Sequence, residues 1–398
     1  MAGNGNRGRS VGAHVASMLT IMRPIVCVLM AVITNASGSE SQRVPFGPGV
    51  CGPVDPIYVK GATETGGQPF PMSPTEVGKS SRIMESSLLP DMMLWASGNG
   101  EDSYSIPVDR TVVRMMFSGT FDATGGSLTL IAPDGTVIQQ GDRIEDTPLN
   151  CGRIITVDAP ANGTWQVRMA PTGRFWLTIH AKSDVSLTDA AFVDHEARPE
   201  SDRVVKIQGE PITGRPATLR VSISPAFKSP TFQLVSLDGR ALQSIDLPSA
   251  DDLEFIGTIM LPIEPFRVLV NGRDESGTRT QRVWPRLFHG EVVEVVPPAG
   301  ETALAGAELP VTFTIRNHGP AVRLNLVSSD HRGNVIAVDP PTLELGAGAE
   351  AIATIQLKVP AGARAASEVS IRLTATSDGT AAVGGFNTAS KTFSVTRE

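Results

Sequence analysis

The sequence predicts a mainly β protein with three consecutive β-sandwich modules, preceded by a short α/β segment. Short runs of β-branched and apolar residues recur along most of the 398 residues, and turn signals separate them. The 39 glycines and 30 prolines lie between these runs and not in one tract, as expected where many turns connect strands. A chain of this length forms two to four domains, each with its own core.

The composition narrows the class of partner. Hydrophobic residues make up 41% and charged residues 19% of the chain, proportions typical of a globular protein. The formal net charge is −7, and the sequence has no basic stripe that would displace counterions from phosphates. We therefore expect no nucleic-acid partner.

Residues 1–37 have the layout of a secretory signal peptide. Arg7, Arg9 and Arg23 precede the apolar run 25–33, and small residues follow it. The run is too short to span a bilayer, which takes about 20 residues, so we expect no transmembrane span. A buried strand of a parallel sheet would be equally apolar and short, and this alternative stays open. The signal predicts a secreted, extracellular protein.

The cysteines Cys27, Cys51 and Cys151 offer no metal or redox motif, because none belongs to a C-x-x-C pair. If Cys27 is removed with a cleaved leader, Cys51 and Cys151 remain as a candidate disulfide in an oxidising compartment. The spacing alone leaves their pairing open.

Segment 38–90 is expected to contain a strand at 57–59 and then a helix. Ser73 and Glu76 form a capping box, with Pro74 at the first helical position. The sequence therefore predicts a helix start at Ser73.

Three apolar side chains of this helix are expected to share one buried face. They are Val77, Met84 and Leu88, at spacings of seven and four residues. Pro90 ends the segment.

A series of motifs runs through this segment: Tyr58, Thr65-Gly66-Gly67-Gln68, Phe70 and Glu76-Val77. In this order they resemble the end of a von Willebrand factor type A domain, above all those of hemicentin-type extracellular proteins. The resemblance continues beyond the segment in Ser105-Ile106-Pro107-Val108-Asp109, Pro133-Asp134-Gly135 and Gly163-Thr164-Trp165. The resemblance implies that 38–90 is the tail of an A domain and that the protein has a structural or adhesion role.

Complete A domains of this type hold a divalent ion in a D-x-S-x-S loop near their start. No such loop lies upstream of residue 57, and Asp184-Val185-Ser186-Leu187-Thr188, which matches loosely, is interpreted as a turn. The metal-dependent adhesion of the family does not carry over. Two alternatives stay open: a truncated adhesion protein whose metal site lies upstream, or a remnant that serves only as a docking helix.

We place the modules at 91–194, 195–290 and 291–398. In the first, Trp165 and Trp176 lie on predicted strands and are expected in the core. A charged, proline-containing linker at 195–202 is expected to open the second.

The third module has the clearest strand pattern. Val311, Phe313 and Ile315 alternate with polar residues and share one face. This module looks like the immunoglobulin-like folds that follow A domains, so we expect three tandem immunoglobulin-like β-sandwiches. Such modules bind partners or space them.

The sequence offers no catalytic motif, so we expect no enzyme and no cofactor. The runs Asp194-His195-Glu196 and Ser329-Asp330-His331 would suit a metal site or a triad, but each lies in an expected loop. We interpret both as solvated polar loops.

Other candidate sites are a glycosylation site and two acidic clusters. Asn162-Gly163-Thr164 meets the N-glycosylation pattern, although Asn-Gly also simply makes turns. The clusters 142–146 and 251–254 are weak candidates for Ca²⁺.

The leading hypothesis is a non-catalytic structural or adhesion protein that binds extracellular proteins or glycans through its sandwiches. An accessory protein that presents ligands or carbohydrate for a secreted system is the alternative. Exposed aromatic side chains on one sheet face would favour that alternative.

Overall fold

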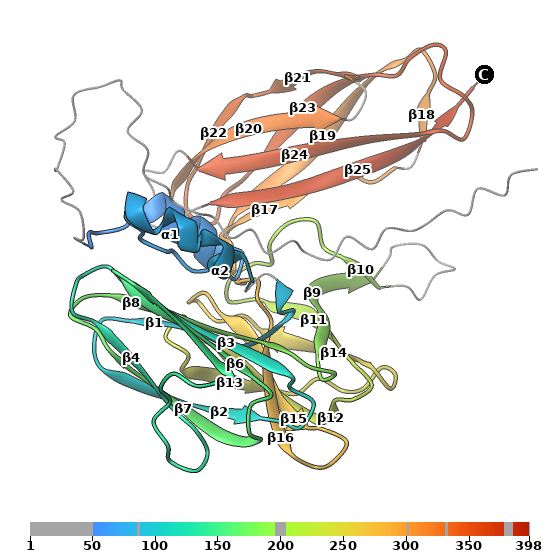
Figure 1. The fold of residues 1–398 in the computed structure, drawn as a ribbon. Coiled ribbons are helices and arrows are strands. Elements are labelled where there is room, and N and C mark those ends of the chain that lie inside the picture. Colours follow the sequence, from blue (N-terminus) through green and yellow to red (C-terminus); the bar gives the residue numbers. More distant parts are fainter. Residues whose placement is uncertain are drawn as a thin grey trace, which may run out of the picture.

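The computed structural model describes residues 51–85, 88–195, 204–300, 302–330, 333–377 and 385–397. These residues form three β-sandwiches after a short helical segment, and Figure 1 shows the third sandwich set apart from the other two. The predicted fold class is confirmed: the chain is mainly β, with several sheets and a helical N-terminal part. The signal peptide expected at 1–37, with Cys27, lies outside the described residues.

The N-terminal segment contains α1 (Pro56–Glu64), a 3-10 helix η1 (Pro74–Lys79) and α2 (Ser80–Glu85). The strand predicted at 57–59 is wrong, because these residues lie in α1. Asp55 accepts a hydrogen bond from the Ile57 amide at 2.9 Å and caps the helix. Pro56 fits its first position. This cap outweighs the strand preference of Ile57, Tyr58 and Val59.

The capping box predicted at Ser73 is present, with the Ser73 amide donating to Glu76 at 3.1 Å. The predicted buried face is wrong: Val77, Met84 and Leu88 are 44%, 58% and 75% exposed, while Ile83 is buried. The helix begins as a 3-10 turn with three residues per turn, which rotates the later positions away from an α-helical stripe.

The first module packs the sheet β1-β8-β3-β6-β5 against the sheet β2-β7-β4. Its strands are β1 (Asp91–Gly98), β2 (Asp102–Val108), β3 (Arg114–Phe121), β4 (Ser127–Ile131), β5 (Ile144–Leu149), β6 (Gly152–Asp158), β7 (Gly163–Ala170) and β8 (Phe175–Lys182). Trp165 lies in the core between the sheets, as predicted, against Phe117. Trp176 is equally buried but faces the second module.

The second module packs the sheet β10-β9-β11-β14 against the sheet β13-β12-β15-β16. Its strands are β9 (Leu187–His195), β10 (Val204–Lys206), β11 (Pro216–Ile223), β12 (Lys228–Val235), β13 (Ala241–Ile245), β14 (Glu254–Met260), β15 (Arg267–Arg273) and β16 (Arg279–Val283). β9 pairs with β11, so the boundary predicted after residue 194 is wrong. Ala190 and Phe192 of β9 are buried in the second core, which fixes the strand there. Most of the linker expected at 195–202 lies outside the described residues.

The third module packs the sheet β17-β19-β23-β21 against the sheet β18-β25-β24-β20-β22. Its strands are β17 (Val293–Val296), β18 (Thr302–Leu304), β19 (Glu308–Asn317), β20 (Val322–Asp330), β21 (Val335–Asp339), β22 (Thr342–Leu345), β23 (Glu350–Lys358), β24 (Glu368–Ser377) and β25 (Phe386–Thr396). The alternation of β19 is confirmed, since Val311, Phe313 and Ile315 are all buried in one core.

None of the helices in the described part of the chain has the length and apolar character needed to cross a membrane.

Candidate functional sites: an inter-module core and an open sandwich edge

A buried core joins the first two modules. Trp95 and Trp176 of the first module pack with Val283 of the second, and Val54 and Val59 of the N-terminal segment lie against them. Burial of apolar surface contributes about 25 cal/mol per Å², and large aromatics bury the most. The two modules and the N-terminal segment therefore share one core.

An ion pair lies inside this junction. Arg282 on β16 donates to Asp109, which follows β2, at 2.8 Å, and both side chains are almost fully buried. Arg282 also donates to the Ser183 hydroxyl at 2.7 Å and to the Val185 carbonyl at 2.8 Å. Burial alone would raise the pKa of Asp109, but the charge of Arg282 and several hydrogen bonds hold it below its usual value. The ionised pair thus fixes one module against the other.

The N-terminal segment is fastened to both modules. Trp95 donates its indole N–H to the Gly67 carbonyl at 2.8 Å, and the guanidinium of Arg267 stacks on the Trp95 ring at 4.2 Å. Arg267 also donates to the carbonyls of Thr63 and Pro285. Burial lowers the pKa of Arg267 to about 9. This arginine therefore binds the segment and the second module to the same indole.

The segment also covers the outer face of the first module's larger sheet. Cys51 and Cys151 form a disulfide, which ties the start of the segment to the turn between β5 and β6. Gln68 is buried and hydrogen-bonds Thr120 and Thr178, on β3 and β8. The disulfide and these hydrogen bonds thus hold the segment against the sheet.

The structure also places the predicted glycosylation site and the loose metal-loop match. Asn162 is exposed in the turn before β7. In the loose metal-loop match at 184–188, Val185 is buried in the second module's core. The structure thus gives that motif a packing role.

Asp146 and Asp251, one from each acidic cluster, already have partners within the protein. Asp146 makes a two-pronged ion pair with Arg153, at 2.9 and 2.8 Å. Asp251 accepts from the amides of Leu253 and Glu254, beside a cavity of about 670 Å³ in the second module. Among the described residues no group of three or more His, Cys, Asp or Glu side chains could hold a metal.

The histidine-containing runs are separated from one another. Asp194 and His195 end β9, and Glu196 lies outside the described residues. Asp330 ends β20 and accepts from the Val335 amide at 2.6 Å, while His331 lies outside the described residues. The two runs thus lie in different modules and do not form a common site among the described residues.

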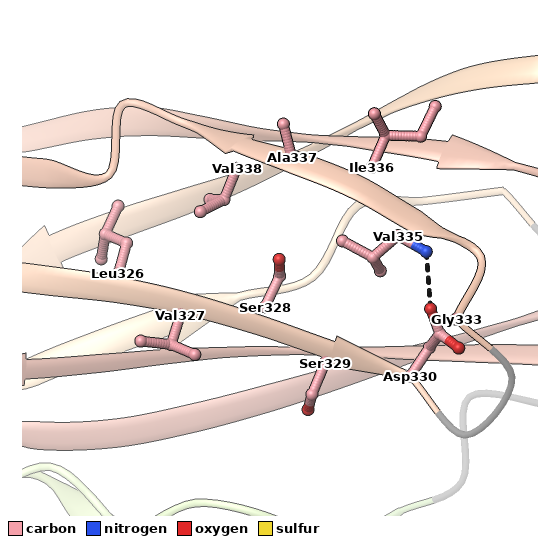
Figure 2. A pocket seen from close by; sticks show the side chains of 10 residues that line it. All are labelled: Leu326, Val327, Ser328, Ser329, Asp330, Gly333, Val335, Ile336, Ala337 and Val338. Carbon is pink, nitrogen blue, oxygen red and sulfur yellow. Dashed lines mark hydrogen bonds between the residues drawn. The ribbon is translucent and has the colours of Figure 1, made fainter.

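Asp330 belongs to the second candidate site, an open edge of the third module. β20 and β21 follow one another in the chain but enter different sheets, so the two strands do not pair with each other. Figure 2 shows the groove between them. It has a volume of about 470 Å³, and Leu326, Ser328 and Val338 point into it. We call it the β20–β21 groove.

Backbone edges line both sides of the groove. β22 pairs only with the first half of β20, over 322–325, and the next ladder bond runs from the Leu326 amide to Pro341. Since amides alternate between the two sides of a strand, Ser328 directs its amide to the side that β22 leaves open. β21 pairs with β23 on one side, and no described strand pairs with its other side. Both edges can accept a further strand.

Sequence reasoning missed both sites. The Asp109–Arg282 pair joins residues 173 positions apart, and the groove depends on which sheet each strand enters. The one usable signal for the groove was the polar Ser328 at a position of β20 whose neighbours Leu324 and Leu326 are buried.

Comparisons with known proteins agree with the fold of the third module. Residues 292–396 match the family model described as VWA7 Ig-like domain. No curated protein matches the chain.

Similarities to solved structures are distant. The mouse nectin-like molecule 4 ectodomain is 9% identical, with 75% of this chain and 95% of that one covered and a TM-score of 0.18. A titin I67–I69 fragment is 13% identical, with 75% and 98% covered and a TM-score of 0.18. The Bacillus licheniformis lipase BlEst2 in its propeptide form is 10% identical, with 50% and 43% covered and a TM-score of 0.25. This chain thus spans less than half of that lipase. The third module is similar to VWA7 Ig-like domains.

Proposed function

We propose that this chain is a non-catalytic extracellular protein that binds a partner through the β20–β21 groove of its third module. An immunoglobulin-like domain is in general a protein-interaction module, but a fold alone does not name a function. The observation that supports the proposal is the groove itself. It combines two open strand edges with an apolar floor.

The groove suits an extended polypeptide segment. Five residues of β20, Leu326 to Asp330, line it, which corresponds to about 17 Å of strand. An added strand would bond to the free backbone groups and place alternate side chains over Leu326 and Val338. The exposed Val327 and Ile336 extend the apolar surface beside it.

Two further features support an extracellular role. The Cys51–Cys151 disulfide is typical of oxidising compartments, and Asn162 is exposed where a glycan would have room. The carbohydrate-presenting alternative has less support. Among the described residues the exposed large aromatics are Tyr58 and Phe386, which lie on different parts of the molecule.

A library of linear peptides displayed on phage, selected on the whole chain, tests the proposal. Figure 2 shows Ser328 pointing toward β21 and Ser329 pointing away from it, so the two make a matched pair. We expect selected peptides to lose at least about tenfold in affinity on Ser328→Tyr, which fills the groove, because a lost fit of about 1.4 kcal/mol is tenfold. Ser329→Tyr should bind as the wild type does. Equal binding by both variants would place the interaction elsewhere.

A further inference from the structure

The junction between the second and third modules is polar. None of the buried apolar clusters in the described residues spans it: one core ends at Phe288 and the next begins at Val293. The Asn387 side-chain amide donates to the carbonyls of Glu210 and Val293, at 3.0 and 2.7 Å. The third module is therefore held by hydrogen bonds and charges, unlike the first two.

A histidine lies at the centre of these contacts. The His318 ring, after β19, has its Nδ1 atom 3.1 Å from a guanidinium nitrogen of Arg215 in the second module. Its Nε2 atom lies 2.8 Å from a carboxylate oxygen of Glu294 on β17. A guanidinium has only donors, so Nδ1 must accept and Nε2 must carry the proton. The contact with Arg215 thus requires a neutral imidazole.

We infer that His318 makes the junction between the second and third modules sensitive to pH. When Nδ1 gains a proton, two donors face each other at 3.1 Å and two positive charges become neighbours. The bond from Arg215 is then lost, while the bond to Glu294 becomes stronger. The third module keeps the pair between His318 and Glu294 but loses the hydrogen bond to Arg215 of the second module. Its position relative to the second module therefore changes on acidification. Imidazole is the side chain that ordinarily changes charge between about pH 5 and 8.

The charged neighbours of His318 come from three elements. Glu294 of β17 also lies 4.0 Å from Arg215 and 3.7 Å from Arg316 of β19. Arg316 pairs in turn with Glu350 of β23 at 3.2 Å. Glu294 is therefore shared, and it holds Arg215 less closely than His318 does.

A second histidine, His289, lies near this junction, and protonation has the opposite effect on its contact. His289 lies 3.3 Å from Glu291, whose other oxygen accepts from the Phe386 amide at 3.2 Å. The hydrogen bond that His289 donates to the Glu291 carboxylate is the main cause that raises the pKa of His289. Glu210 and Glu64 also lie nearby, and Arg286 pairs with Glu210. Protonation strengthens this contact. His289 thus provides an internal control.

Energy transfer between dyes on the second and third modules tests the inference. The exposed Ile263 and Ile352 are changed to cysteine for labelling, in a Cys27→Ser background that keeps the disulfide. We expect a second population of molecules, with a different inter-dye distance, to appear as the pH falls from 7.5 to 5.5. Its ratio to the first population should rise by at most about tenfold per pH unit, which is the limit for uptake of one proton. In His318→Gln, which accepts and donates without titrating, the distance should not change with pH. Arg215→Gln should also remove the shift.

His289→Gln should keep the shift. A wild-type distance that is constant over this range would overturn the inference. So would a shift that survives His318→Gln, or one that disappears only in His289→Gln. Peptide binding at the β20–β21 groove is measured separately, so failure of one idea does not decide the other.

Discussion

Removing the charge of Asp109 should loosen the first two modules from each other. Asp109→Asn keeps the shape of the side chain but removes the carboxylate that the buried guanidinium of Arg282 contacts directly, which leaves Asp91 as the remaining acidic neighbour. Asp109 accepts from Arg282 at 2.8 Å and from Thr280 at 2.7 Å on one oxygen, and from Thr111 on the other. Breaking a buried pair by removing one partner costs about 3–5 kcal/mol.

Tryptophan fluorescence during urea unfolding measures this cost directly. The four tryptophans, Trp95, Trp165, Trp176 and Trp284, all lie in the first two modules. We expect the free energy of unfolding reported by fluorescence to fall by about 3–5 kcal/mol. The control is Glu275→Gln, in the exposed pair between Glu275 and Lys228 of the second module, which should cost less than about 1 kcal/mol.

A double variant separates the charge from the packing. Replacing both partners with apolar residues, as Asp109→Leu with Arg282→Met, removes both charges of the pair and should cost less than Asp109→Asn alone. A loss below about 1 kcal/mol in Asp109→Asn would refute the reasoning. It would mean that the guanidinium finds water or another acceptor and that the ion pair does not hold the junction.

Three other perturbations follow from the same structure. Cys51→Ser opens a disulfide between residues 100 apart and should lower the fluorescence-detected stability by about 4–5 kcal/mol in the chain-entropy view; no change relative to Cys27→Ser would contradict this. Burial lowers the pKa of His180 to about 4 from 6.5. The neutral imidazole therefore makes its full contribution to the free energy of unfolding above about pH 6.5. This contribution, about 3 kcal/mol in total, is lost as the pH falls toward 4. Unfolding at pH 7 and pH 4.5 should show a smaller difference in His180→Gln than in the wild type, and equal differences would argue against it. Phe313→Ala should cost about 3–5 kcal/mol in the third module, visible by circular dichroism while the tryptophan transition stays in place; a shift of both would show that the modules unfold together.

The third module was the easiest part to predict, and the reason is local. Val311, Phe313 and Ile315 alternate with polar residues, and a strand with one buried face requires that pattern. Trp165 was predicted correctly for a similar reason, because a large aromatic on a strand of a small sandwich has little place other than the core. Local pattern was sufficient in both cases.

Two predictions failed for different reasons. Residues 57–59 are Ile-Tyr-Val, which favour strands, but the neighbouring Asp55 cap and Pro56 make them helical. β9 follows β8 with no clear break, and its pairing with β11 and the burial of Phe192 in the second core assign it to the second module. The first error had a local cause, whereas the second depended on partners far along the chain.

The candidate sites were the least predictable part. Asp109 and Arg282 are ordinary charged residues in sequence, and become a buried pair only when two modules meet. The groove exists because β20 and β21 enter different sheets. A hairpin reading would have paired the two strands and closed it.

The central claim is that the chain binds an extended segment along the β20–β21 groove. Hydrogen–deuterium exchange of the whole chain, with and without a peptide selected on it, tests this most directly. We expect slower exchange of the amides in 326–338, with Ser328 among the most protected because its amide faces the groove. Protection confined to the first or second module, with 326–338 unchanged, would contradict the claim.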